Sequence, residues 1–131
     1  MPTQKEDLKA LTKLGKTAYA SRTLEVFPNH APGEIDVVLH CTEFTCICPM
    51  TGQPDYADIE ISYAPDKHVV ESKSMKLYLE TFRNVGVFHE HLAVDIGKDF
   101  VKFLKPLKVA VTVKFHVRGG IAIDATWRYQ K

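Results

Sequence analysis

One segment near the C-terminus constrains the fold most strongly, because apolar residues occupy every second position along it. The apolar positions are Val109, Val111, Val113, Phe115 and Val117, and the residues between them are Ala110, Thr112, Lys114 and His116. A period of two predicts a half-buried β-strand. Two consecutive glycines, Gly119 and Gly120, then break the pattern, and a last strand continues from Ile121 through Ile123 and Ala125. The end of the chain is therefore expected to form two strands joined at the glycines.

The remaining elements follow from the same reading of periodicity. Two strands are expected at 35–42 and 56–63, and two helices at 72–85 and 89–104. The second helix has an apolar stripe at Leu92, Ile96, Phe100 and Phe103, and Pro106 ends it. The order strand, strand, helix, helix, strand, strand predicts an α+β fold, with both helices on one face of an antiparallel four-stranded sheet.

The length and charge of the chain limit its organisation and its partners. Its 131 residues fit one domain, expected at 21–131, after an N-terminal arm at 1–20 with a short helix that a Thr3–Glu6 capping box would start. A net charge of +1 argues against a general binder of nucleic acids or membrane surfaces. No apolar run has the length of a membrane span, and the N-terminus lacks the apolar core of a secretory signal, so a cytoplasmic protein is expected.

Cys48 and Asp55 stand at the two sides of a loop that Pro49, Gly52 and Pro54 keep out of a helix. A thiolate and a nearby carboxylic acid suit addition to a carbon–nitrogen multiple bond, since one attacks carbon and the other protonates nitrogen. The pattern equally allows a structural cysteine with a turn aspartate. A zinc site made of His40, Cys41, Cys46 and Cys48 is also open, although the usual second, distant ligand pair is missing.

Three further stretches carry groups that could bind a ligand. Lys73 and Lys76 share one face near the start of the first helix, behind Ser72 as the expected N-cap, where an anion would offset the unfavourable dipole. His89-Glu90 opens the second helix, where a carboxylate can accept paired N–H donors from a guanine-like edge. Arg118, before the glycines, can approach a phosphate. Each stretch has a plain structural reading too: a solvated lysine face, a helix start and a hairpin turn. A Rossmann fingerprint is absent.

Together these stretches resemble the single-domain NADPH-dependent 7-cyano-7-deazaguanine reductases. The resemblance runs from about Ser21 to the end of the chain. It rests on Cys48-Pro49, Thr51-Gly52-Gln53-Pro54-Asp55, Val70-Glu71-Ser72-Lys73-Ser74-Met75-Lys76-Leu77-Tyr78, Phe88-His89-Glu90 and Arg118-Gly119-Gly120.

The resemblance implies a tunnelling fold, whose sheets join into oligomeric barrels, typically two stacked pentamers with active sites between subunits. It implies reduction of a nitrile to an aminomethyl group in queuosine biosynthesis, with two NADPH per turnover, no metal and no direct contact with nucleic acid. Cys48 would form the thioimide and Asp55 would donate the proton. Val70, Glu71, Ser72, His89 and Glu90 would hold the deazaguanine, and Lys73, Lys76 and Arg118 would face the cofactor phosphates.

The chain departs from the family pattern at one position, and competing functions stay open. Some relatives carry a second cysteine just after the His-Glu pair, where His91 and Leu92 stand here, so a protective disulfide with Cys48 is in doubt. The same fold also carries amidinotransferases that use a thioimide on tRNA, but these lack the lysine-bearing motif. A non-catalytic purine- or pterin-binding module and a zinc-dependent GTP cyclohydrolase activity are the remaining candidate functions.

Overall fold

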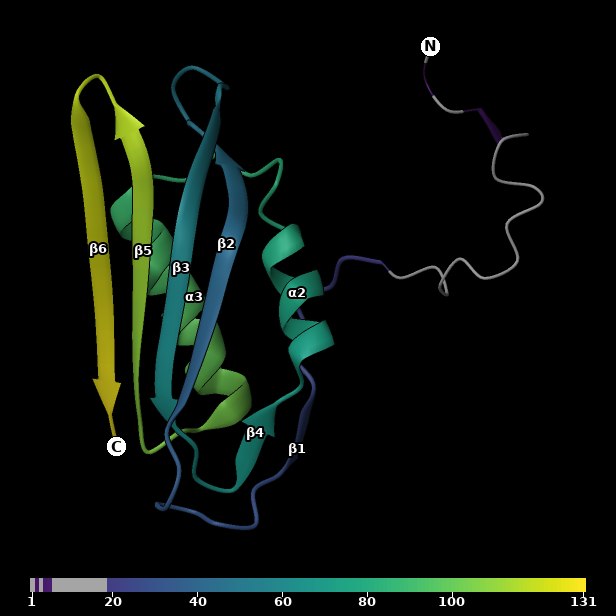
Figure 1. The fold of residues 1–131 in the computed structure, drawn as a ribbon, viewed down its shortest axis with the longest axis vertical. Helices are drawn as coiled ribbons and strands as arrows, with labels where there is room; N and C mark the ends of the chain where they lie inside the picture. The colour runs from purple at the N-terminus through teal and green to yellow at the C-terminus, as the bar shows by residue number, and fades with distance from the viewer. Residues whose placement is uncertain (1, 3, 6–18) are drawn as a thin grey trace.

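The computed structural model describes residues 2, 4–5 and 19–131. The helix expected after Thr3 lies outside the described residues. A four-stranded antiparallel sheet has the order β2-β3-β5-β6, and helices α2 and α3 lie on one of its faces (Figure 1). The bounds of its strands are Val37–Ile47 for β2, Pro54–Ala64 for β3, Lys108–Arg118 for β5 and Ile121–Gln130 for β6. The predicted α+β order is confirmed.

A two-stranded sheet, which the sequence did not predict, joins β1 (Val26–Pro28) to β4 (His68–Val70). The pairing is anchored on the main sheet, since the Tyr63 hydroxyl accepts a hydrogen bond of 3.1 Å from the backbone N–H of Val70. This small sheet leads the chain directly into α2.

Helix α3 (His89–Leu104) has the predicted bounds because its pattern and its stop signal agree. Leu92, Ile96 and Phe100 are fully buried against the sheet. The helix ends where Lys105 adopts a left-handed conformation and its N–H bonds to the Val101 carbonyl, just before a proline. Its register on the sheet depends on Gly97, since a Cβ there would overlap the ring of Trp127.

Helix α2 (Ser72–Glu80) is shorter than the predicted 72–85. The Thr81 hydroxyl donates to the Tyr78 carbonyl at 2.6 Å, and the chain continues in tight turns instead of a helix. The backbone at 85–87 then pairs with the end of β2: Ile47 donates to the Val85 carbonyl and accepts from the Val87 N–H. This pairing competes with helix formation and moves the helix end back to Glu80.

Strand β2 is longer than the predicted 35–42 because a β-bulge interrupts its alternation. Cys41 pairs with Ile59 and Phe44 with Ala57, so β2 has three residues where β3 has two. The extra residue changes which positions face the helices: Leu39 and Cys41 before the bulge, Phe44 and Cys46 after it. The bulge therefore carries the strand onward to Ile47 and to the edge of the cysteine loop.

Candidate active site

The thiol of Cys48 follows β2 directly and opens a closed turn. Its backbone N–H donates to the Gln53 carbonyl at 2.8 Å, and its carbonyl accepts from Gly52 at 2.9 Å. Gly52 has φ of +70°, which favours glycine. Cys48 itself is half-buried. The hydroxyl of Thr51, followed by the backbone N–H groups of Thr51 and Met50, stabilises the thiolate and lowers the pKa of Cys48 below 9.0. The turn therefore favours the reactive form of this sulfur.

The other two cysteines differ from Cys48. Cys46 is fully buried, and burial together with the charges of Asp55 and Cys48 raises its pKa to about 11. Cys41 is half-buried on the wall of a cavity. All three thiols are free. Among the described residues, no group of three histidine, cysteine, aspartate or glutamate side chains is arranged to hold a metal ion.

Asp55 lies at the start of β3 and is buried, at 5% exposure, with both carboxylate oxygens in contact with a basic side chain. Oδ2 lies 3.3 Å from Nε2 of His89, the first residue of α3. Oδ1 accepts a hydrogen bond from the guanidinium of Arg118, whose other terminal nitrogen donates to the amide oxygen of Gln53. The carboxyl group is held in place by residues from two other elements.

Phe115 fixes the ring of His89. The two rings are stacked with centroids 3.4 Å apart and planes at 6° to each other, and Phe115 is buried on β5. Glu90 follows His89 in the first turn of α3 and is exposed. One end of the sheet therefore brings together five of the predicted site residues, from β2, β3, α3 and β5. These residues are Cys48, Asp55, His89, Glu90 and Arg118.

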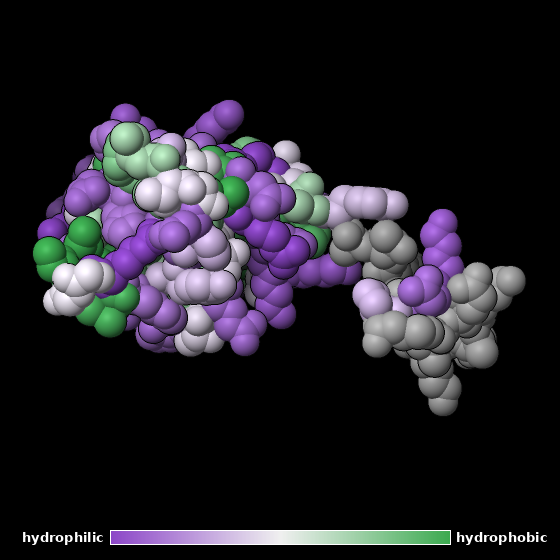
Figure 2. Space-filling model, turned by 90° about the horizontal axis from the view of Figure 1, so that it is seen from above, coloured by the Kyte–Doolittle hydropathy of each residue, from purple (hydrophilic) through white to green (hydrophobic). Residues whose placement is uncertain are grey.

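This end of the molecule also exposes large apolar side chains. Figure 2 looks down onto it and shows apolar patches among hydrophilic surface. Those on the segments next to the site are Met50, Phe88, Val117 and Ile121, each at least 49% exposed. Apolar surface beside a polar, pre-formed group of side chains is typical of a face that another molecule covers.

The remaining predicted residues lie elsewhere, at the start of α2. Val70 is buried in β4, and Glu71, not the predicted Ser72, is the N-cap of α2. The Glu71 carboxylate accepts hydrogen bonds of 2.7 Å from the N–H groups of Lys73 and Ser74, which lower the pKa of Glu71. The expected need for an external anion at this helix start is thus met by Glu71 itself.

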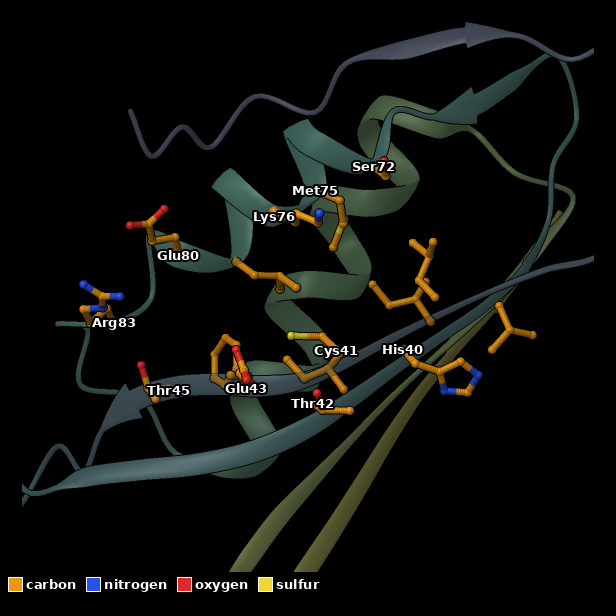
Figure 3. Close-up of a pocket in the computed structure, with 16 residues that line it drawn as sticks. His40, Cys41, Thr42, Glu43, Thr45, Ser72, Met75, Lys76, Glu80 and Arg83 are labelled. Atoms are coloured by element: carbon orange, nitrogen blue, oxygen red, sulfur yellow. The ribbon is translucent and has the colours of Figure 1, made fainter. Parts of the chain in front are cut away.

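A cavity of about 490 Å³ separates α2 from β2 (Figure 3). Lys76, Glu80 and Arg83 lie on the α2 side, and Cys41 and Glu43 lie on the strand. Ser72 lies toward the His40 end of the cavity and Arg83 toward the Thr45 end (Figure 3).

The α2 group is therefore distant from the cysteine turn. His40 precedes Cys48 by eight residues, or roughly 25 Å of strand at about 3.3 Å per residue. Val70 is bonded to Tyr63, far along β3 from Asp55, and among the described residues no hydrogen bond or ion pair joins the start of α2 to the Cys48 turn.

The sequence alone did not indicate the two partners of Asp55 or the role of Phe115. Arg118 was expected to face cofactor phosphates and His89 to face the substrate base, but in the structure both contact Asp55. Phe115 was assigned only to the core side of its strand. One signal was present in the sequence, since the apolar alternation at 109–117 ends just where Arg118 begins the turn.

Comparisons with known proteins agree on one family. The family model described as "QueF-like protein" matches residues 54–131. A protein named NADPH-dependent 7-cyano-7-deazaguanine reductase from Syntrophus aciditrophicus is 52% identical over 98% of this chain and 93% of its own length. One of the same name from Frankia casuarinae is 52% identical over 93% and 98%.

A solved structure with a similar fold is described as the archaeosine synthase QueF-Like in the apo form. It has a TM-score of 0.67 and 25% sequence identity, and the match covers 71% of this chain and 91% of that one. In the part of the chain that the structure describes, no helix is long and apolar enough to cross a bilayer.

Proposed function

The chain belongs to the QueF-like protein family, and from that premise we propose that it reduces the nitrile of 7-cyano-7-deazaguanine through a covalent thioimide on Cys48. The overall activity, an NADPH-dependent reduction in queuosine biosynthesis, is that of curated relatives that share about half of its residues over nearly their full length. The single observation that supports the covalent step is the Cys48 turn, where hydrogen bonds stabilise a half-exposed thiolate close to a buried carboxyl group.

The first step uses groups from this chain alone. The thiolate of Cys48 adds to the nitrile carbon, one π bond of the nitrile breaks, and its electron pair moves to nitrogen. Asp55 delivers a proton to that nitrogen. Reduction of a nitrile to an amine takes four electrons, which corresponds to two hydrides and hence two NADPH.

Recognition of the substrate and the cofactor is assigned to the two groups of residues described above. The carboxylate of Glu90 suits the N–H edge of the deazaguanine, with His89 beside it and with Val70, Glu71 and Ser72 as further contacts. Lys73 and Lys76 are exposed cations that fit the cofactor phosphates, and Arg83 lies with Lys76 on the wall of the cavity. Arg118 is a third candidate for the phosphates.

These two groups are separated within one chain, so we assign the complete site to an interface between subunits. The sheet supports this assignment, because β2 and β6 are its edge strands, with 11 and 10 residues. Long edge strands favour pairing with another chain. The assembly is a homo-oligomer, of the barrel type and with two stacked pentamers. The protein acts in the cytoplasm on a small molecule, without direct contact with nucleic acid.

An alternative activity on the same scaffold is an amidinotransferase, since one structural neighbour is an archaeosine synthase. That neighbour is 25% identical, whereas the two reductase-named relatives described above are each 52% identical. NADPH oxidation with the free nitrile base decides between the two, because only the reductase consumes the cofactor.

Intact mass spectrometry tests the covalent step most directly. The protein is incubated with 7-cyano-7-deazaguanine in the absence of NADPH, and an adduct with the full mass of the base is expected on Cys48. No adduct on the wild-type protein would contradict the thioimide.

Mixing two inactive variants tests the shared site. Cys48→Ala and Lys76→Ala subunits are mixed under conditions that allow exchange. Recovery of turnover is expected, because some sites then combine an intact turn with an intact helix. No recovery in oligomers shown to be mixed would place the whole site within one subunit.

A further inference from the structure

The guanidinium of Arg118 donates a hydrogen bond from each terminal nitrogen to residues at the start of β3, and this pair of hydrogen bonds is the Arg118 fork. One terminal nitrogen donates to Oδ1 of Asp55 and the other to the amide oxygen of Gln53, the two residues on either side of Pro54. A planar guanidinium with two fixed acceptors has little rotational freedom. The carboxyl group of Asp55 is thereby held between Arg118 on one oxygen and His89 on the other.

A β-bulge is what brings Arg118 to this position. Phe115 pairs with Ile123 and Arg118 with Ile121, so β5 has three residues where β6 has two. In a regular strand, residues three apart point to opposite faces. The extra residue places the side chain of Arg118 on the same face of β5 as Phe115, whose ring stacks on that of His89. One strand therefore serves both partners of Asp55.

We propose that Arg118 is a positioning residue for Asp55 in the thioimide-forming step, which precedes any use of the cofactor. The proposal rests on the proposed function. It goes beyond a contact with cofactor phosphates, because two nitrogens of the guanidinium are bound to Asp55 and Gln53 and a phosphate binding the same nitrogens would have to displace them.

The proton balance of the step defines the role of Arg118. Cys48 has already lost its thiol proton when the sulfur–carbon bond forms, and the nitrile nitrogen gains one proton as a π bond breaks. Asp55 enters the step protonated, delivers that proton to nitrogen and leaves the step as the carboxylate, so nothing is oxidised or reduced. During the transfer Asp55 becomes the carboxylate, and Arg118 fixes its direction while its positive charge stabilises that form.

The test measures adduct formation without NADPH, using stopped reactions and intact mass spectrometry across a range of pH. Arg118→Gln is expected to slow the adduct by about 10- to 100-fold, since misplacing a reacting group by about 1 Å can cost about 100-fold, and to change the pH profile of the rate. Gln53→Leu, which keeps the charge and loosens the fork, is expected to cause a smaller loss in the same direction.

The matched control is Arg128→Gln, which removes the same charge from an exposed position on β6 paired with Ala110. Its adduct rate should equal that of the wild type. The proposal is overturned if both Arg118→Gln and Gln53→Leu form the adduct at the wild-type rate while Arg118→Gln has a raised KM for NADPH. Arg118 would then be a cofactor ligand alone. The wild-type protein is measured first. If it forms no adduct, the proposed function fails; if it does, the variants test the role of Arg118 alone.

If Arg118→Gln does not fold, as judged by thermal unfolding, Gln53→Leu alone decides. A wild-type adduct rate in that variant then counts against the fork.

Discussion

The two ends of the four-stranded sheet are built in different ways. At the end near Tyr63, strands pair without interruption, and the Tyr63 ring packs edge-on against Phe100 at 4.8 Å between centroids. At the end near Asp55, bulges shift the register of β2 and β5. Where apolar and polar residues alternate regularly along a strand, its inner face is wholly apolar. Where a bulge changes the alternation, as in β5, a polar side chain such as that of Arg118 reaches the face of the sheet that carries the helices. The difference predicts that stability and activity can be altered separately.

The largest effect is expected at Cys48. Cys48→Ala should reduce turnover by about a thousandfold or more, because the nucleophile is removed, and should change the free energy of unfolding by less than about 0.5 kcal/mol, as for a surface residue. NADPH oxidation and denaturant unfolding measure the two quantities.

Cys46→Ala is the matched control for that variant. It should still form the adduct but lose about 1–2 kcal/mol of stability, because it leaves a small cavity in the core. A Cys48→Ala protein that turns over normally, or a Cys46→Ala protein that cannot form the adduct, would break the comparison.

Gly97→Ala, where α3 packs on β6, should be the most destabilising of the changes outside the site. The added Cβ overlaps the Trp127 ring, and overpacking costs about 1–3 kcal/mol even against the small gain in helix propensity. The adduct rate measured below the unfolding transition should not change. Lys98→Ala, on an exposed neighbouring position of α3, should unfold like the wild type.

Tyr63→Phe tests the tie between the main sheet and β4. The Val70 N–H loses its buried acceptor, which should cost about 1–2 kcal/mol. Tyr56→Phe, at an exposed tyrosine on the same strand, should cost less. Equal losses in the two variants would mean that the buried hydrogen bond contributes nothing, and thermal unfolding at matched concentrations measures it.

The smallest effect is a shift in pH dependence. Hydrogen bonds, first from the Thr51 hydroxyl, lower the pKa of Cys48, so alkylation by iodoacetamide should rise with pH at a midpoint below 9.0. Thr51→Val removes the first cause and should move the midpoint upward, with slower alkylation near pH 7. Cys46, with a pKa of about 11, should stay unmodified. An unchanged midpoint in Thr51→Val would contradict the role of this hydroxyl.

The regular parts of the fold could be predicted from the sequence, and the interrupted parts could not. Helix α3 was predicted to the residue because its stripe and its stop at Lys105-Pro106 depend on local signals. The second half of β2 was missed because the bulge shifts the apolar positions from Leu39 and Cys41 to Phe44 and Cys46.

Contacts between distant residues were beyond the sequence. Arg118 lies 63 residues from Asp55 and 65 from Gln53, so no spacing rule joins them. The N-cap was placed one residue late, because Ser72 has a suitable side chain but the longer Glu71 carboxylate reaches two N–H groups. The predicted site residues were chosen for the chemistry that their side chains carry, but their distribution over two separate regions required the fold.

The short pairing between Ile47 and the chain at 85–87 limits how the sheet can grow. Both backbone groups of Ile47 on its outer side are occupied by Val85 and Val87. A strand added alongside β2 therefore runs out of free partners before it reaches Cys48. The segment at 85–87 therefore ends the free edge of β2 one residue before Cys48.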